Sequence, residues 1–199
     1  NLNDEALEQF LVAHQIDPTD VQVLEYISDT YAYKDDIDNA LIYANKIVES
    51  QPDNHDSYRV LGWLYDYFNQ YPESLENYER ALLLSPNNFQ IMSSIGRLLE
   101  ITGDYKESLD IYEEMLSLAA NQADYIEAYG SIMNHCANTG QIRKSIQYLD
   151  KVVEYQKQKD INGLNTSMLE MDRASLLIKI GKYDEAEELV RITREKVFD

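Results

Sequence analysis

Residues 56–88 read DSYRVLGWLYDYFNQYPESLENYERALLLSPNN, and this stretch decides the fold. Apolar and small residues recur in it at helical spacing, as a first set of Tyr58, Leu61, Gly62 and Tyr65 and a second set of Ser74, Tyr78 and Ala81. A recurrence every three or four residues is typical of a helix with one buried face and not of a strand. Pro86 follows the second set and cannot continue the helix before it. The stretch therefore predicts a pair of helices.

The same pattern repeats along the chain with a fixed period. Pro18, Pro52 and Pro86 fall 34 residues apart, and each is followed by Thr, Asp or Asn, short polar residues that can cap the next helix. The stretch and its period resemble the tetratricopeptide repeat, whose pattern is W-x2-L-G-x2-Y, then A-x3-F, then P, about every 34 residues. Here Tyr58 fills the place of the family's buried tryptophan.

The resemblance implies an all-α fold, a right-handed α-solenoid of antiparallel helix pairs covering residues 1–199. Later in the chain the period lengthens, because Gly103, Gly140 and Gly181 mark turns that are 37 and 41 residues apart. Residues 156–165, QKQKDINGLN, are predicted to form a longer loop. We expect residues 1–20 to be the second helix of a truncated repeat, full 34-residue repeats at 21–54, 55–88 and 89–122, and divergent, longer repeats at 126–159 and 167–199.

The formal net charge of −19 is concentrated in one part of the chain. Residues 1–139 hold 25 Asp and Glu against 6 Lys and Arg, a balance of −19, whereas residues 140–199 hold 11 of each. Such a surface repels nucleic acid and anionic lipid and attracts a basic partner. Keeping a repeat protein soluble is the plainer explanation of the same acidity.

No group of residues in the sequence predicts an enzyme, a cofactor or a metal site. His14, His55 and His135 are far apart in sequence, and no HExxH, GxSxG or phosphate-binding glycine loop occurs. Cys136, the single cysteine, takes an inward helix position and is predicted to be a small buried residue rather than a nucleophile. Asp35, Asp36 and Asp38 lack the glycine and terminal glutamate of a calcium loop.

The candidate site comes from the resemblance. In this family the first helices of successive repeats line a concave groove, and chaperone-binding members place Lys and Asn there to hold a terminal carboxylate. Glu25 and Asp29 take those places here, so an acidic C-terminal peptide is not expected. Trp63, with Tyr67 one turn later, is the predicted anchor, and packing against the neighbouring first helix is the alternative for its ring. The predicted peptide-binding residues are Glu25, Asp29, Tyr33, Arg59, Trp63, Asp66, Tyr67, Arg97, Glu100 and Asn134.

These observations favour a non-catalytic scaffold that binds a basic or apolar protein segment in its groove. One alternative is the repeat segment of a larger enzyme or regulator, such as a glycosyltransferase-like or signalling protein, and another is a secretion- or assembly-type chaperone. The first residue is Asn and no basic-then-apolar leader follows, so either a leader was removed or the sequence is part of a longer protein. A cytoplasmic location is expected, with no nucleic-acid or membrane partner.

Overall fold

The computed structural model describes residues 2–156 and 164–198, and all of its regular structure is α-helical. None of the helices in these ranges is both long and apolar enough to cross a membrane. The helices are α1 (Leu2–Ile16), α2 (Val21–Ala32), α3 (Ile37–Ser50), α4 (His55–Tyr67), α5 (Tyr71–Leu84), α6 (Phe89–Thr102), α7 (Tyr105–Leu118), α8 (Gln122–Asn138), α9 (Ile142–Gln156), α10 (Leu164–Lys179) and α11 (Tyr183–Phe198).

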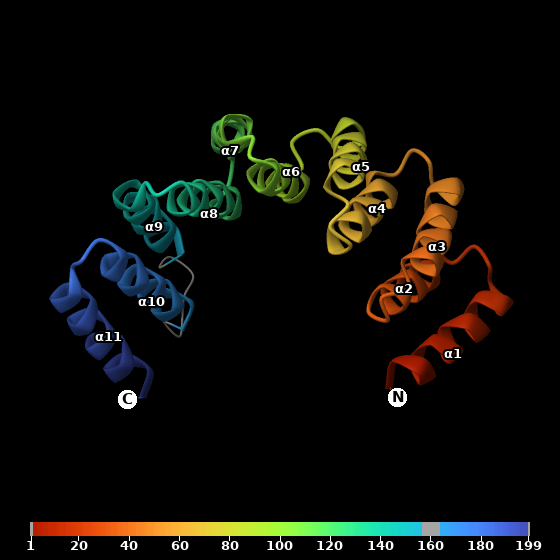
Figure 1. Cartoon of the computed structure of the whole chain (residues 1–199), viewed down its shortest axis with the longest axis horizontal. Coiled ribbons are helices and arrows are strands. Elements are labelled where there is room, and N and C mark those ends of the chain that lie inside the picture. The colour runs from red at the N-terminus through yellow and green to blue at the C-terminus, as the bar shows by residue number, and fades with distance from the viewer. Residues whose placement is uncertain (1, 157–163, 199) are drawn as a thin grey trace. The chain divides into compact units, whose positions relative to one another are not determined.

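The chain divides into two compact units, Asn1–Leu98 and Leu99–Asp199. In the first unit α2 packs on α3 and α4 packs on α5, so consecutive helices form pairs (Figure 1). In the second unit α8 pairs with α9, and α10 pairs with α11. The predicted all-α architecture of antiparallel helix pairs is confirmed.

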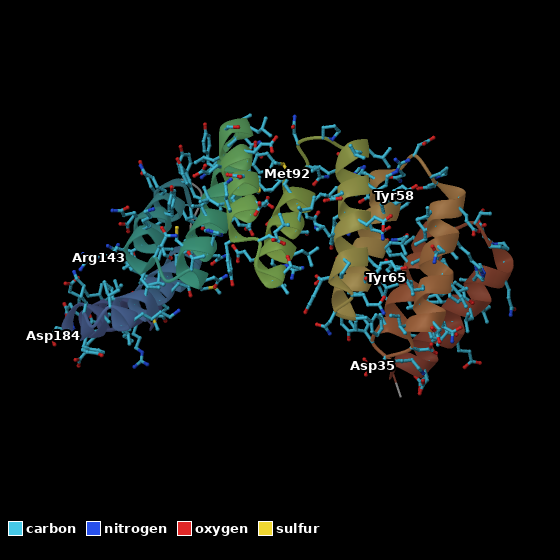
Figure 2. The ribbon with its side chains drawn as sticks, turned by 45° about the horizontal axis from the view of Figure 1, so that its top comes forward. Asp35, Tyr58, Tyr65, Met92, Arg143 and Asp184 are labelled. Carbon is cyan, nitrogen blue, oxygen red and sulfur yellow. The ribbon has the colours of Figure 1, made fainter. Side chains whose placement is uncertain are left out.

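Each helix pair buries the small residues and rings that the repeat pattern places inward. In the first unit the core joins Leu24, Ala40, Ala44 and Ile47 of α2 and α3 to Leu61 and Leu64 of α4. Tyr58 and Tyr65 lie about two turns apart along α4 (Figure 2), and Tyr65 packs against the same core. In the second unit Leu149 and Val153 of α9 pack with Leu176 of α10, and Cys136 is buried in α8 as predicted.

Short polar residues begin the first helix of each early repeat. Asp20 accepts hydrogen bonds from the Gln22 and Val23 N–H groups, at 3.0 and 3.2 Å. The Asn54 side chain accepts from the Asp56 N–H at 3.0 Å, and Asn88 accepts from the Ile91 N–H at 3.2 Å. The caps therefore lie two residues after each proline, not directly after it. Their 34-residue spacing fixes where α2, α4 and α6 start.

The turn inside each pair uses one left-handed residue. Gly103, Gly140 and Gly181 have φ of 97°, 77° and 78°, as the glycine spacing predicts, and Asp35 and Asn69 take the same place with φ of 57° and 59°. In each turn the next N–H donates to a carbonyl five residues back, as in Asp36 to Tyr31 at 3.0 Å and Gln70 to Tyr65 at 2.8 Å. This is the Schellman arrangement, which satisfies the last carbonyls of a helix.

The later repeats contain one longer helix and differ from the prediction at one loop. α8 has 17 residues against 13 in α4, so helix length accounts for part of the longer period. The loop predicted at residues 156–165 falls mostly outside the described residues, but its ends do not. Gln156 closes α9 and Leu164 opens α10, so the prediction of a loop is wrong at residue 156 and at residues 164–165. The error has a local cause. Asn165 and Thr166 are disfavoured in helix interiors, which suggests a loop, but they suit the first turn of a helix.

Candidate functional site: an aromatic and acidic face on the first unit

Three aromatic rings meet where α2 and α4 end. The Trp63 and Tyr67 ring centroids are 5.5 Å apart, which follows from their spacing of four residues on α4. Tyr33, the residue that caps the end of α2, meets both rings edge-on, at 6.5 Å from Trp63 and 6.1 Å from Tyr67. Edge-to-face contacts at these distances are favourable for aromatic rings. The three rings therefore form one cluster that joins two repeats.

The cluster is open to solvent on one side. Tyr33 is 60% exposed and Tyr67 is 41% exposed, although both are large apolar rings. Trp63 is only partly buried and packs against the core that Leu61 and Leu64 belong to. The ring thus packs on the core and contacts Tyr33 at the end of the neighbouring first helix, as the packing alternative expects, and its role as an anchor stays a prediction. A surface hollow of about 670 Å³ lies along α3 instead, lined by Asp38, Leu41, Ile42, Asn45, Lys46 and Glu49, so the cluster is a platform rather than the wall of that hollow.

Charged side chains lie one turn before the rings on each helix. Glu25 and Asp29 precede Tyr33 on α2 at intervals of four residues, and Arg59 precedes Trp63 on α4 at the same interval. The Arg59 guanidinium is 2.8 Å from the Asp56 carboxylate and 3.8 Å from that of Glu25. Asp66 forms an ion pair with Arg97 of α6. We call Glu25, Asp29, Tyr33, Arg59, Trp63, Asp66 and Tyr67 together the aromatic–acidic face.

Asp29 is the electrostatically unusual member of this face. Burial first, and then the nearby Glu25 carboxylate, raise the pKa of Asp29 from 3.8 to about 6, and the Arg59 guanidinium only partly opposes them. A carboxyl with a pKa of about 6 titrates close to neutral pH, whereas an ordinary surface aspartate is fully ionised there. Carboxyls with such a shift are concentrated at binding and catalytic sites, although structural networks also produce them.

Of the remaining predicted site residues, Arg97 lies in the first unit, where it pairs with Asp66, and Glu100 and Asn134 lie in the second unit. The Glu100 carboxylate is largely buried, at 8% side-chain exposure, and contacts His135 Nδ1 at 2.9 Å and Asn138 Nδ2 at 2.9 Å. Glu100 therefore joins α6 to α8 within that unit. Asn134 is exposed on α8, one residue before the buried His135. Sequence reasoning missed the partnership with His135, because that histidine occupies an inward position which nothing in the local pattern marks as polar.

The described part of the second unit also exposes apolar side chains that the sequence analysis did not single out. Met168, Met171 and Ile178 lie at intervals of three and seven residues on α10, with exposures of 64%, 40% and 51%. Their spacing places them along one side of that helix. The net charge of zero over residues 140–199 distinguishes this region from the acidic first unit.

The side chains of the aromatic–acidic face are suited to binding a partner. Burial raises the pKa of the Cys136 thiol, so the thiol stays protonated and is a poor nucleophile. Among the residues that the structure describes, no three His, Cys, Asp or Glu side chains come together in a way that could hold a metal ion. Rings and carboxylates that line one face are suited to holding an apolar or cationic side chain of a partner.

Comparisons with known proteins agree with the repeat pattern. Residues 59–124, a third of the 199-residue chain, match the family model described as tetratricopeptide repeat. No curated protein sequence matches the chain.

Solved structures extend the likeness beyond the matched segment. BtubC from P. vanneervenii superposes with a TM-score of 0.73 at 14% identity, covering 98% of this chain and 87% of its own. The type IV pilus biogenesis factor PilW gives a TM-score of 0.72 at 16% identity, covering 94% and 82%. The thermophilic TPR protein TTC0263 of Thermus thermophilus gives 0.67 at 19% identity, covering 88% and 91%. Identities this low show a shared fold.

Repeat scaffolds of this kind are typical protein-interaction modules, because stacked helix pairs create extended binding surfaces. Residues 59–124 therefore match the tetratricopeptide repeat, and the solved structures show that the same kind of fold extends over most of the chain.

Proposed function

We propose that the chain is a non-catalytic scaffold that binds a protein or peptide segment on its aromatic–acidic face. The observation that carries the proposal is the cluster of Tyr33, Trp63 and Tyr67, whose rings contact one another while Tyr33 and Tyr67 stay substantially exposed. Exposed ring clusters lose contact with water when a partner covers them, and aromatic residues dominate the energetics of many interfaces. Carboxylates around the rings favour a segment with basic or apolar side chains.

The acidic residues determine which charge on a partner segment is favoured. Four carboxylates, those of Glu25, Asp29, Asp56 and Asp66, share the two guanidiniums of Arg59 and Arg97. The face therefore keeps an excess of negative charge at neutral pH. It attracts a basic segment at long range and repels an acidic one. This charge excess supports the expectation that an acidic C-terminal peptide is not the ligand.

A peptide-display selection on the purified chain tests the proposal. Peptides enriched on the wild-type chain should bind Trp63→Ala about 30-fold more weakly, because loss of a hot-spot ring costs about 2 kcal/mol. Tyr105→Ala is the matched control, since Tyr105 is 49% exposed but lies in the second unit, outside the face. Added salt should also weaken binding.

Equal binding of the enriched peptides to wild type and Trp63→Ala would reject the face as the site. A loss with Tyr105→Ala instead would move the site to the second unit. Circular dichroism of both variants checks that the helices are intact, so that a loss of binding is not mistaken for a loss of fold.

A further inference from the structure

The Asp29 carboxyl lies near one other carboxylate and near one cation that also contacts other groups. Glu25 lies one turn before it on α2, and the guanidinium of Arg59 on α4 is the cation that acts on it. Arg59, however, contacts Glu25 and Asp56, and Asp56 in turn has His55 Nε2 at 3.7 Å. Two further cations near α2 are engaged as well, Lys34 with Asp4 of α1 and Lys46 of α3 with His14 of α1. The cation that acts on Asp29 is therefore already engaged elsewhere.

An exposed ring lies one helical turn from this carboxyl. Tyr33 follows Asp29 by four residues, so the two side chains lie on the same side of the end of α2. Tyr33 meets Trp63 and Tyr67 edge-on, at interplanar angles of 70° and 88°. With 60% of Tyr33 exposed, a planar cation can reach its ring, and the partly buried Asp29 lies one turn away. A guanidinium is suited to this pair because it stacks on aromatic faces and bonds carboxylates with two N–H groups.

We propose that Asp29 and Tyr33 form a subsite for an arginine side chain of the bound segment, and that binding of this side chain requires the ionised Asp29 carboxylate. The proposal rests on the proposed function, since it names the side chain that the aromatic–acidic face selects. The arginine supplies the positive charge that Arg59 divides among its other partners. Because a bound guanidinium favours the charged form of Asp29, binding releases a proton wherever the free protein still holds one.

The linkage predicts a measurable pH dependence. The pKa of Asp29 in the free chain is raised to about 6. At about pH 5 only about one Asp29 in eleven is then ionised, whereas almost all are ionised at about pH 7.5. The affinity for arginine should therefore rise about tenfold between these two pH values. Arginine itself does not titrate in this range, so the ligand adds no pH dependence.

The chain contains its own reporter for the experiment. Trp63 is the only tryptophan, and it contacts Tyr33 in the face, so its emission responds to a ligand bound there. The probe is a peptide acetylated and amidated at its ends, Ala-Leu-Arg-Leu-Ala, compared with the same peptide carrying neutral citrulline in place of arginine. Each is titrated into wild type, Asp29→Asn, Tyr33→Ala and the control Asp110→Asn, at about pH 5 and about pH 7.5. Asp110 is an exposed acid of α7 in the second unit.

We expect the arginine peptide to bind wild type and Asp110→Asn about tenfold more tightly at the higher pH, and Asp29→Asn weakly and equally at both. Tyr33→Ala should bind more weakly than wild type while keeping the pH dependence. Equal affinity for the arginine and citrulline peptides, no binding of either, or a pH dependence that survives in Asp29→Asn would overturn the inference. Displayed peptides that need Trp63 but contain no arginine would overturn it and leave the proposed function standing. Peptides that bind without Trp63 would overturn both.

Discussion

Trp63 belongs at once to the core of the first unit and to its exposed face. Its ring packs against the cluster containing Leu61 and Leu64 and also contacts Tyr33 and Tyr67. A substitution there changes stability and binding together, so the two effects must be separated. Tyr33 allows this separation, because it is mostly exposed and contributes little to the core.

The two residues should therefore differ in their cost to folding. Trp63→Ala should lower the free energy of unfolding by about 2 kcal/mol, less than the cost of removing a fully buried ring, because only part of this ring is buried. Tyr33→Ala should change it by less than about 0.7 kcal/mol, as is usual for exposed residues. Urea denaturation followed by circular dichroism measures both. Similar losses for the two variants would mean that Tyr33 is a core residue.

Because the pKa of Asp29 is raised, its contribution to the stability of the fold should decrease as the pH rises. The folded pKa of about 6 lies above the ordinary 3.8, so the protonated carboxyl stabilises the fold. That contribution is fully present below about pH 4 and is lost as the pH rises through about 6. At neutral pH the ionised, half-buried carboxylate is thus a destabilising group.

Asp29→Asn should consequently raise the melting temperature at about pH 7.5 and leave it almost unchanged at about pH 4. Solvent screening of a half-buried group reduces the full effect of the shift, so we expect about 1 kcal/mol, or roughly 2–4 °C. Differential scanning calorimetry at the two pH values measures the difference. A gain of the same size at both would show that the pKa of Asp29 is ordinary.

At the scale of a helix pair, three repeats keep the same serine bond but do not all place the serine on the same helix. In α4 and α5 the Ser74 hydroxyl donates to the Gly62 carbonyl at 2.7 Å. In α2 and α3, 34 residues earlier, Ser28 donates in the opposite direction to the Ala40 carbonyl at 3.0 Å. In α8 and α9 Ser145 again donates to the first helix, at Met133. The close approach of the two helices is therefore retained while the two residues exchange roles.

Gly62 is where this approach leaves no room for a side chain. A Cβ atom there would lie 2.9 Å from the Tyr78 ring, which is itself buried. Gly62→Ala should destabilise the chain by about 1–2 kcal/mol, because overpacking outweighs the better helix propensity of alanine. Gly130→Ala is the matched control, since a Cβ on that helical glycine meets nothing within 4 Å. The control should gain up to about 1 kcal/mol in urea denaturation. Equal effects of the two substitutions would contradict the packing.

At one of the left-handed turns, a substitution should stabilise the chain instead of destabilising it. Asp35 adopts φ of 57° at the place that glycine holds in the three later turns. Asp35→Gly should stabilise the chain by about 0.5–1 kcal/mol, since glycine removes the cost of a left-handed residue with a side chain. Part of the gain is offset by the greater freedom of glycine in the unfolded chain. Thermal melting measures the change, and a lower melting temperature would show that the Asp35 side chain has a stabilising role of its own.

For the whole molecule, the charge distribution should couple stability to salt. Residues 1–139 carry all of the net charge of −19, and repulsion within the folded chain opposes compactness. Raising the salt from about 10 to about 150 mM should therefore raise the melting temperature followed by Trp63 emission, which reports the first unit. The same melt followed by circular dichroism includes the second unit. A melting temperature that falls with salt would mean that ion pairs such as Asp66–Arg97 outweigh the repulsion.

The sequence predicts the fold well because the repeat is a local pattern recurring at a fixed distance. The inward positions of Leu61, Tyr78 and Ala81 followed directly from it, and so did the turns marked by the later glycines. It also placed Trp63 beside Tyr67, because helical spacing alone brings them together. It did not predict the pairing of Glu100 with His135 or the shifted pKa of Asp29. Both depend on how deeply a carboxyl is buried between helices, which no period in the sequence encodes.

The most direct test of the scaffold account is to map where a selected peptide binds, using the backbone amide NMR signals of the chain. If the peptide binds the aromatic–acidic face, the largest shifts on its addition should fall between residues 25 and 33 of α2 and its cap and between residues 59 and 67 of α4, with the Trp63 indole among them. Amides of α3 and α5 should respond weakly, since no residue of the face lies on these helices. The largest shifts in α8 to α11, or in α3 and α5, would contradict the account.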